Sequence, residues 1–427
     1  MKVAVIGAGW AGCAAAVEAT WLGHQVTLFE AARTVGGRAR KVELEYQGQA
    51  LALDNGQHIL IGAYTDTLQL MKDVGVDSGA GLLRMPLTLQ FPDGDGLKLP
   101  NRPAPLDAVW GILTARGWSW GEKFALIRVA TGWRLKNFEC APALSVADIC
   151  KGLPPRIMAT FIEPLCVSAL NTPPERSSGQ VFLRVLHDSL FSVSGGSNLL
   201  LPRLDLGALL PDAACHCLKA NGGLVNIGAR VQALKRTNAG WQLQLDAADA
   251  DTAQVFDKVV LACQPQEAAR LVETTALPCD GWIASARALE HEAIATVYAM
   301  APGARLALPM LALRSGEEFP AQFVFDRGQL GGPAGLLAFV ISASHGSAAT
   351  LGEQVQKQAA AQLGIAGLLV LQTIVEKRAT FACTPGLHRP AMHVAQHLLA
   401  CGDYVDGPYP ATLEGAVRSG LVAARGL

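Results

Sequence analysis

The pattern of apolar and polar positions predicts a strand, a helix and a second strand at the start of the chain. Lys2-Val-Ala-Val-Ile6 is a short apolar run, which is typical of a buried strand. The alanine-rich stretch from Cys13 to Leu22 has the composition of a helix, and Gly23 after it is a residue that ends helices. Gln25-Val-Thr-Leu-Phe29 is a second run of strand length. We therefore expect an αβ unit here.

Similar patterns return in the second half of the chain. Residues 63–200 carry mainly helical patterns, and the αβ character resumes after residue 201. The elements expected there are helices over 206–220 and 412–424 and strands over 224–227, 257–263, 322–326, 336–341 and 397–401. The sequence thus predicts an α/β fold with two interleaved domains. One is assembled from residues 1–65, 201–270 and 380–427, and the other, of mixed α+β type, from residues 66–200 and 271–379.

A Gly-x-Gly-x-x-Gly sequence joins the first strand to the first helix. Gly7 permits the tight turn, Gly9 lets the backbone approach a pyrophosphate, and Gly12 lets the helix pack closely on the strand. The pyrophosphate then sits on the free N–H groups at the helix N-terminus. Glu30, at the end of the second strand, is placed to accept hydrogen bonds from a ribose diol. This context predicts a Rossmann-like dinucleotide site.

The residues after Glu30 narrow the choice of dinucleotide. Arg33-Thr-Val-Gly36-Gly37-Arg38-Ala39-Arg40 places a glycine pair beside arginines, so that backbone and guanidinium converge on phosphate. Enzymes that use only a nicotinamide cofactor do not normally carry this extension. It resembles the second signature of FAD proteins in the amine oxidase and phytoene desaturase superfamily, and it implies FAD as the cofactor.

The composition of the chain is unusually apolar for a soluble globular protein. Its 427 residues carry a formal charge of −1, which argues against nucleic-acid binding, and only 17% of them are charged, with a mean hydropathy of +0.26. Even so, we find no run of about 20 apolar residues that would span a bilayer. The first residues resemble a secretory signal, but the glycine fingerprint within them favours a folded strand and a cytoplasmic protein.

The cysteines, histidines and tryptophans of the chain give weaker indications of its function. The ten cysteines form no Cys-x-x-Cys pair and, like the histidines His388, His393 and His397, they predict no metal site. Dispersed thiols of this kind also favour a reducing cytoplasm. Four tryptophans lie in an otherwise aliphatic stretch, at positions 110, 118, 120 and 133. They are compatible with an apolar tunnel, with contact to a membrane surface, or with ordinary core packing.

With these residues placed, the chain resembles the hydroxysqualene dehydroxylases of bacterial squalene and hopanoid synthesis, which were formerly described as squalene-associated FAD-dependent desaturases. The resemblance extends over nearly the whole length. It rests on Leu53-Asp-Asn-Gly-Gln-His58-Ile-Leu-Ile-Gly-Ala-Tyr64, Pro164-Leu-Cys-Val-Ser-Ala-Leu-Asn171-Thr-Pro-Pro174, Gln180-Val-Phe-Leu-Arg-Val-Leu-His-Asp-Ser189, Leu201-Pro-Arg-Leu-Asp205-Leu, Ala379-Thr-Phe-Ala-Cys-Thr-Pro385-Gly, and Pro410-Ala-Thr-Leu-Glu414-Gly-Ala-Val-Arg418-Ser-Gly420. One departure follows Gly402-Asp403, where Tyr404-Val-Asp406 replaces the Trp-Thr-Asp typical of the family.

The resemblance implies a role for each part of the FAD site. Gly7, Gly9, Gly12 and Glu30 would hold the ADP half, with Gly36, Gly37 and Arg38 at the pyrophosphate. The backbone of Val231 would meet the adenine, and Gly402 and Asp403 the ribitol chain. The helix N-terminus at Thr412 and Leu413 would face the flavin's pyrimidine edge, where reduction places negative charge. Gly56, Gln57 and His58 would lie near the isoalloxazine ring.

The implied reaction is reductive loss of the allylic hydroxyl of hydroxysqualene, with a hydride delivered from reduced flavin N5. An acid must then protonate the leaving oxygen, and the candidates are His58, Asp54, Glu163 and Asp188. His58 is preferred because its motif would place it close to the ring and because an imidazole can donate near neutral pH. Asp54 and His58 are also compatible with a purely structural role, in which they brace a loop beside the flavin.

Two other functions remain open at this point. The same scaffold serves an FAD-dependent isoprenoid desaturase, and a non-catalytic FAD protein that carries polyprenyl lipid would show the same cofactor residues. A second complete Gly-x-Gly-x-x-Gly is missing, so the sequence assigns no nicotinamide electron donor. The expected partners are a C30 isoprenoid, upstream enzymes of the squalene pathway, and transiently the inner face of the cytoplasmic membrane.

Overall fold

The first apolar runs of the chain form the centre of a parallel sheet. In the computed structural model, which describes residues 1–100, 102, 106–192, 194–246 and 254–427, they are β1 (Lys2–Ile6), α1 (Trp10–Trp21) and β2 (Gln25–Glu30). β1 is hydrogen-bonded on one side to β2 and on the other to β14 (Lys258–Leu261), in parallel on both sides. Their apolar side chains are buried because helices cover both faces.

The sheet has six strands, in the order β10-β2-β1-β14-β21-β20. β10 (Leu224–Ile227) and β21 (Leu398–Ala400) extend it in parallel, and β20 (His393–Ala395) closes one edge in the antiparallel direction. Segments from the beginning, the middle and the end of the sequence thus share one sheet. The predicted domain boundaries themselves stay a prediction.

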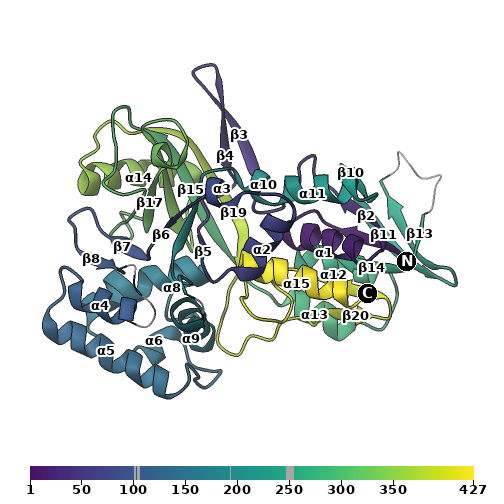
Figure 1. Cartoon of the computed structure of the whole chain (residues 1–427), viewed down its shortest axis with the longest axis horizontal. Helices are drawn as coiled ribbons and strands as arrows, with labels where there is room; N and C mark the ends of the chain where they lie inside the picture. Colours follow the sequence, from purple (N-terminus) through teal and green to yellow (C-terminus); the bar gives the residue numbers. More distant parts are fainter. Residues whose placement is uncertain (101, 103–105, 193, 247–253) are drawn as a thin grey trace.

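The last helix of the chain packs directly on the first. α15 (Leu413–Arg425) lies alongside α1, where a Cβ at Gly420 would come within 2.2 Å of the Ala11 carbonyl oxygen (Figure 1). A side chain at this position would push the two helices apart, so the glycine permits the close approach.

The helix predicted over 206–220 is interrupted. It forms two helices, α10 (Leu206–Leu209) and α11 (Pro211–Ala220), separated by Leu210 with φ −149° and ψ −56°. Proline disfavours the helical conformation in the residue before it, which is why Leu210 leaves the helix. The apolar periodicity continues across the break, so the pattern alone predicted one helix.

A second sheet of five antiparallel strands forms the other main layer, in the order β16-β17-β18-β15-β19. α14 (Ala348–Leu363) packs on it. The strands are β15 (His291–Met300), β16 (Met310–Ala312), β17 (Phe323–Asp326), β18 (Leu336–Ser342) and β19 (Leu369–Phe381).

The region expected to be helical carries helices and short strand pairs. Its helices, π-helical turns included, are α2 (Thr65–Asp73), α3 (Ser78–Gly81), α4 (Leu106–Thr114), α5 (Trp120–Leu135), α6 (Val146–Ile149), α7 (Pro155–Ile157), η1 (Met158–Ile162), α8 (Glu163–Leu170), α9 (Gly179–His187) and η2 (Asp188–Ser192). The short pairs come from β5 (Leu60–Ile61), β6 (Leu82–Met85), β7 (Thr88–Gln90), β8 (Gly96–Lys98) and β9 (Leu199–Pro202). Strands of two to four residues are too short for a period-two pattern to predict.

Smaller elements complete the fold. They are β3 (Lys41–Tyr46), β4 (Gln49–Asp54), β11 (Val231–Thr237), β12 (Gly240–Leu245), β13 (Val255–Phe256), α12 (Pro265–Glu273), α13 (Asp280–Arg287) and η3 (Arg327–Leu330). None of the helices within the described ranges is long and apolar enough to cross a bilayer.

Candidate active site

A cavity of about 930 Å³ opens at the carboxyl ends of the parallel strands. Ile6 at the end of β1, Phe29 in β2 and Ala262 just after β14 line it. Ligands of open α/β sheets bind outside these strand ends. The volume lies at the upper end of the range for small-molecule sites, so the cavity can take a large ligand.

The turn after β1 leaves no room for side chains. Gly7 has a φ of +110°, and a Cβ there would lie 2.7 Å from the Ala262 carbonyl oxygen. A Cβ at Gly12 would lie only 1.8 Å from the Gly7 carbonyl oxygen. Gly7 lines the cavity, whereas Gly12 lies behind it and allows α1 to begin directly against the turn.

The N-terminus of α1 faces the cavity with unused hydrogen-bond donors. Gly9 is the N-cap, no side chain caps the helix, and the first turn has no acidic residue. Trp10 and Ala11 of this turn line the cavity. Such amides, together with the helix dipole, favour a bound anion.

The glycine pair of the second motif packs against this helix start. The N–H of Gly36 donates to the Ala8 carbonyl oxygen at 2.8 Å, and a Cβ at Gly37 would lie 3.3 Å from the Gly9 Cα. Two segments nearly thirty residues apart in sequence therefore form one backbone wall of the cavity.

Glu30 and Val231 line the part of the cavity beyond β2. The Glu30 carboxylate accepts hydrogen bonds from the N–H groups of Ala8 and Ala32, both at 2.8 Å. These bonds fix the carboxylate at the strand end. The backbone before Val231 is tied to the same place, since the N–H of Ala229 donates to the Glu30 carbonyl oxygen at 2.8 Å.

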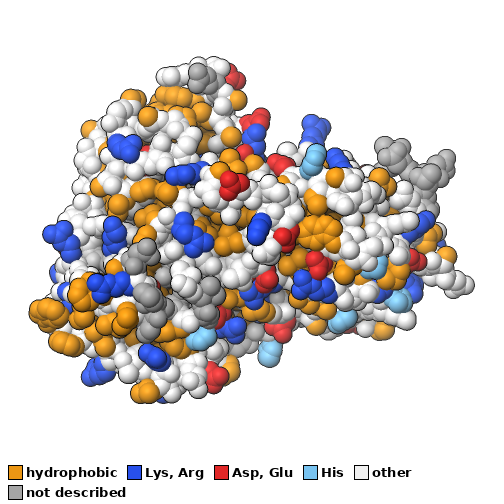
Figure 2. All heavy atoms as spheres, in the orientation of Figure 1, with side chains coloured by type: hydrophobic (Ala, Val, Ile, Leu, Met, Phe, Trp, Pro, Cys, Tyr) orange, Lys and Arg blue, Asp and Glu red, His pale blue; other side chains and the backbone are white. Residues whose placement is uncertain are grey.

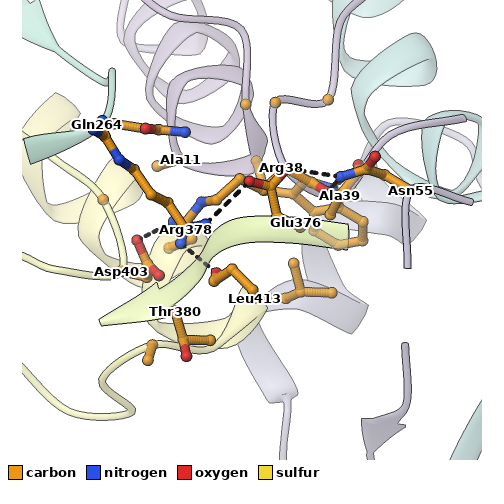
Figure 3. A pocket seen from close by; sticks show the side chains of 18 of the residues that line it. Ala11, Arg38, Ala39, Asn55, Gln264, Glu376, Arg378, Thr380, Asp403 and Leu413 are labelled. Carbon is orange, nitrogen blue, oxygen red and sulfur yellow. Dashed lines mark hydrogen bonds and ion pairs between the residues drawn. The ribbon is translucent and has the colours of Figure 1, made fainter. Parts of the chain in front are cut away.

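An ion pair joins three distant segments across the cavity (Figure 3). The Arg38 guanidinium contacts Asp403 Oδ1 at 2.5 Å and donates to the Ala379 carbonyl oxygen at 2.6 Å. Asp403 is buried, so its charge needs this partner. Next to it the N–H of Gly402 donates to Ser419 Oγ at 3.1 Å.

A second helix start also faces the cavity. Thr412 caps α15, because its Oγ1 accepts from the N–H of Gly415 at 3.0 Å and donates to the Tyr409 carbonyl oxygen at 2.7 Å. Both Thr412 and Leu413 line the cavity. Tyr409 and Ala411 before the cap have positive φ values of 58°, a rare conformation for residues other than glycine.

The loop after β4 places Gly56, Gln57 and His58 in the cavity lining. Nδ1 of His58 donates to the Gly56 carbonyl oxygen at 2.6 Å, which leaves Nε2 as the acceptor of the neutral ring. Burial lowers the pKa of His58, and the Arg38 charge lowers it further against the opposing effect of the Gly56 bond. His58 is therefore neutral at neutral pH.

The other candidate acids lie elsewhere. Asp54 does not line the cavity: its Oδ1 accepts from the N–H of Leu206 at 2.7 Å, and burial raises its pKa to about 7. Asp54 therefore braces the end of β4 against α10. Glu163 is exposed on α8 and lines neither this cavity nor the second one described below.

Asp188 belongs to that second cavity. Burial acts to raise its pKa, but hydrogen bonds from His187 at 2.8 Å and Arg184 at 2.6 Å, with a further one from Tyr409, hold the pKa below its usual value. Asp188 is thus a carboxylate and has no proton to donate at neutral pH.

Three polar residues of β19 also face the cavity, and the sequence analysis missed them. Glu376 and Arg378 alternate along the strand and point into the same space, and Thr380 also lines the cavity (Figure 3). The amide of Asn55 donates to Glu376 at 3.0 Å. The period-two polar pattern within 369–381 was the available signal.

The second cavity, of about 240 Å³, adjoins the first. Its lining is mostly aliphatic and aromatic, and it comes largely from residues 59–199, including Trp133. The two cavities share the lining residues Ile59, Tyr64, Ser168, Ala169, Phe323 and Thr412. An apolar chain in the smaller cavity would therefore end beside whatever occupies the larger one.

Most of the sequence, from the start of α1 onward, matches a known family model. Residues 10–427 match the model described as flavin-containing amine oxidoreductase. The chain belongs to this family. Its cofactor is FAD.

The relatives of this flavoprotein include full-length and local matches. A hydroxysqualene dehydroxylase of Rhodopseudomonas palustris is 29% identical, over 99% of this chain and 97% of the relative, and one of Zymomonas mobilis is 26% identical, over 98% and 97%. A zeta-carotene desaturase of Zea mays is 40% identical, but over only 18% of this chain and 13% of its own.

Solved structures share the fold of this flavoprotein. An oxidoreductase of Methanosarcina mazei has a TM-score of 0.73 at 18% identity, with all of both chains covered. A putrescine oxidase variant has a TM-score of 0.72 at 14% identity, over 100% of this chain and 98% of its own. The amine oxidase-type FAD fold expected from the sequence is therefore confirmed.

The residues around the larger cavity fit FAD. Uncapped amides of α1, the Arg38 guanidinium and the backbone wall of Gly9 and Gly37 suit a pyrophosphate. Two buried polar atoms in the lining, Tyr404 Oη and Gln266 Oε1, have no hydrogen-bond partner among the described residues. Buried polar atoms are normally paired, so these two are available to a bound ligand.

Proposed function

We propose that this flavoprotein removes the allylic hydroxyl of hydroxysqualene to give squalene. The observation that carries the proposal is the apolar cavity that opens onto the FAD cavity through shared lining residues. Full-length similarity to proteins named hydroxysqualene dehydroxylase supports it, because the match to a desaturase is only local.

The reaction is a net two-electron reduction. FAD, when bound in its reduced form, supplies a hydride from N5. The C–O bond breaks, its oxygen takes up one proton and leaves as water, and the electron pair of the hydride forms the new C–H bond. The chain must therefore hold the polyene in place, exclude bulk water and provide the proton.

The apolar cavity performs the first two tasks. Side chains such as Leu97, Leu126 and Phe161 in its lining offer the polyene no hydrogen bonds and exclude water that would capture an allylic cation. Polar groups are present at the junction with the larger cavity, where the side chains of Tyr64 and Thr412 line both cavities. Burial raises the pKa of Tyr64, so its phenol keeps a proton with which it can orient a substrate hydroxyl.

His58 provides the proton in this proposal. Since Nδ1 is engaged with Gly56, only an imidazolium can donate from Nε2. Burial lowers the pKa of His58, so this form is populated as the pH falls. The rate of the proton-dependent step should accordingly rise from neutral towards acidic pH. Asp54 acts as a positioning residue at the start of the same loop.

An anaerobic experiment tests the reaction. FAD-loaded protein is reduced with dithionite and mixed with hydroxysqualene, and we expect flavin reoxidation together with formation of squalene. Lipid binding without reoxidation would instead indicate a carrier, and reduction of oxidised flavin by squalene or phytoene would indicate a desaturase. Either result would refute the proposal.

The same experiment with the His58→Gln variant tests the proton donor. This variant should bind FAD normally, reoxidise at least about tenfold more slowly, and lose the rise in rate towards acidic pH. A parent-like rate and pH profile would remove His58 from the mechanism and leave the reaction itself standing.

A further inference from the structure

Large apolar side chains are unusually exposed on α4 and α5. Trp120 is 62% exposed, Phe124 61% and Trp110 46%, with Leu106 and Val109 exposed beside Trp110 on α4. Figure 2 shows hydrophobic side chains gathered at this end of the molecule, over the two helices labelled in Figure 1. Monomeric proteins rarely expose such groups together unless the surface binds something.

Trp118 and Trp133, in contrast to this exposed set, belong to the hydrophobic core. Both are buried, and Trp118 donates from Nε1 to Thr160 Oγ1 at 3.0 Å. The four tryptophans therefore do not all serve the same one of the roles that the sequence leaves open. Two serve packing and the cavity lining, and the other two, Trp110 and Trp120, face solvent.

The charge of this region differs in sign from that of the chain. Residues 102–136 contain six Lys and Arg against two Asp and Glu, so their formal charge is +4 in a protein of −1. Two cations contact the exposed rings. The guanidinium of Arg102, which is exposed, is 4.5 Å from the centroid of Trp110. Nζ of Lys123, which is buried and donates to the Leu113 carbonyl oxygen at 2.8 Å, is 4.9 Å from the centroid of Trp120. Aromatic rings with adjacent cations suit the boundary between acyl chains and anionic headgroups.

The inner sides of the same helices line the apolar cavity. Ala108 and Ile112 of α4 and Leu126 and Ala130 of α5 contribute to it. Val109 of α4 belongs to the exposed surface and to the cavity, because it is 44% exposed and also lines the cavity. The cavity thus reaches the exposed apolar surface at α4.

We propose that the exposed face of α4 and α5 docks on a membrane containing anionic lipid, and that the C30 substrate enters the apolar cavity past Val109. The second half of this statement rests on the proposed function. The adjacent cations favour a lipid surface over a protein partner, and a C30 polyene resides in the bilayer. The helices lie on the membrane and do not cross it.

Vesicle co-sedimentation of the FAD-loaded full chain tests the docking. The parent should bind phosphatidylcholine vesicles that contain phosphatidylglycerol and bind pure phosphatidylcholine more weakly, with binding reduced by salt. The triple variant Trp110→Ser, Trp120→Ser, Phe124→Ser should lose about tenfold or more in vesicle affinity. Arg128 in α5 and Lys136 at its C-terminal end are both exposed, so the variant Arg128→Glu, Lys136→Glu should lose the preference for anionic lipid.

Controls separate docking from folding and from catalysis. The matched variant Trp21→Ser, Leu22→Ser changes exposed apolar residues at the end of α1 and should bind vesicles like the parent. The triple variant should keep its flavin spectrum and its reoxidation rate with detergent-dispersed hydroxysqualene. Failure of that reoxidation in the parent would refute the proposed function while leaving vesicle binding intact.

Two results would overturn the docking proposal. One is parent-like vesicle binding by the triple variant. The other is a parent that binds no vesicles but forms a dimer in solution that the triple variant abolishes, because the face would then be a contact between copies of the chain.

Discussion

The two adjoining cavities are built in opposite ways. The FAD cavity is walled by glycine backbone, helix N-termini and the Arg38–Asp403 ion pair, and it depends on atoms whose positions the main chain fixes. The apolar cavity is walled by side chains from α4, α5, α8 and α9, and it depends on their combined shape. Fixed dipoles suit the constant charge of a pyrophosphate, whereas an aliphatic lining suits a long hydrocarbon.

The largest effect should come from adding one methyl group at Gly12, directly behind the glycine turn that lines the larger cavity. Gly12→Ala places a Cβ against the Gly7 carbonyl oxygen, so the turn must move; we expect a loss of about 3 kcal/mol or more in unfolding free energy and loss of bound FAD. Gly132→Ala in α5 meets nothing within 4 Å and should be neutral or stabilise by up to about 1 kcal/mol. Flavin absorbance and thermal unfolding measure both. Equal flavin content and equal thermal stability of the two variants would contradict the difference in construction between the two cavities.

A smaller effect should follow from filling the junction. Ala169 of α8 lines both cavities, so Ala169→Phe should lower kcat/KM for hydroxysqualene by roughly 10–100-fold through misplacement of the chain, with FAD content unchanged. Ala220→Phe, at an exposed position at the end of α11, is the matched control. Retained turnover in Ala169→Phe would mean that substrate reaches the flavin by another route.

A third effect, which appears only when the pH is changed, concerns the carboxyl group of Asp54 behind the larger cavity. Burial raises the pKa of Asp54 to about 7, so the folded protein binds this proton more tightly than the unfolded chain between about pH 4 and pH 7. Its contribution to stability is complete below pH 4 and is lost as the pH rises through 7, by roughly 2–4 kcal/mol.

Asp54→Asn keeps an acceptor for the Leu206 N–H and removes the titration. In FAD-saturated protein, the melting temperature of Asp54→Asn minus that of the parent should therefore increase from pH 5 to pH 8. Parallel melting curves across that range would show that Asp54 titrates as an exposed carboxyl does. Asp54→Ala, which lacks the acceptor, should be less stable than Asp54→Asn at both pH values.

The sequence predicted the polar cavity better than the apolar one. The reason is that several residues of the polar cavity lie close together in the sequence. Gly7, Gly9 and Glu30 lie within one strand–helix–strand unit, so their spacing fixes their geometry. Glu376 and Arg378 approach them only through the second sheet, which no local spacing encodes. FAD and the fold followed from the motifs, whereas the β19 wall needed the structure.

The candidate acids show a second limit of sequence reasoning. Asp54 and His58 are four residues apart, but only His58 lines the cavity, because β4 ends at Asp54 and the chain turns after it. Burial then shifts their pKa values in opposite directions, upward for the carboxyl and downward for the imidazole. Neither orientation nor desolvation is readable from residue type, so the preference for His58 rested on the motif and on the chemistry of imidazole alone.

The position of β1 between β2 and β14, with β21 next in the sheet and α15 packed on α1, has a consequence for biosynthesis. During translation the glycine turn is made early, but its neighbours Asp403, Thr412 and Gly420 emerge only after nearly all the intervening chain. The nascent protein must therefore keep its first strand and helix from aggregating until α15 has been made, and cofactor capture must wait for that segment. Truncation within α15 should consequently leave a chain that never retains flavin, however intact its N-terminal motif.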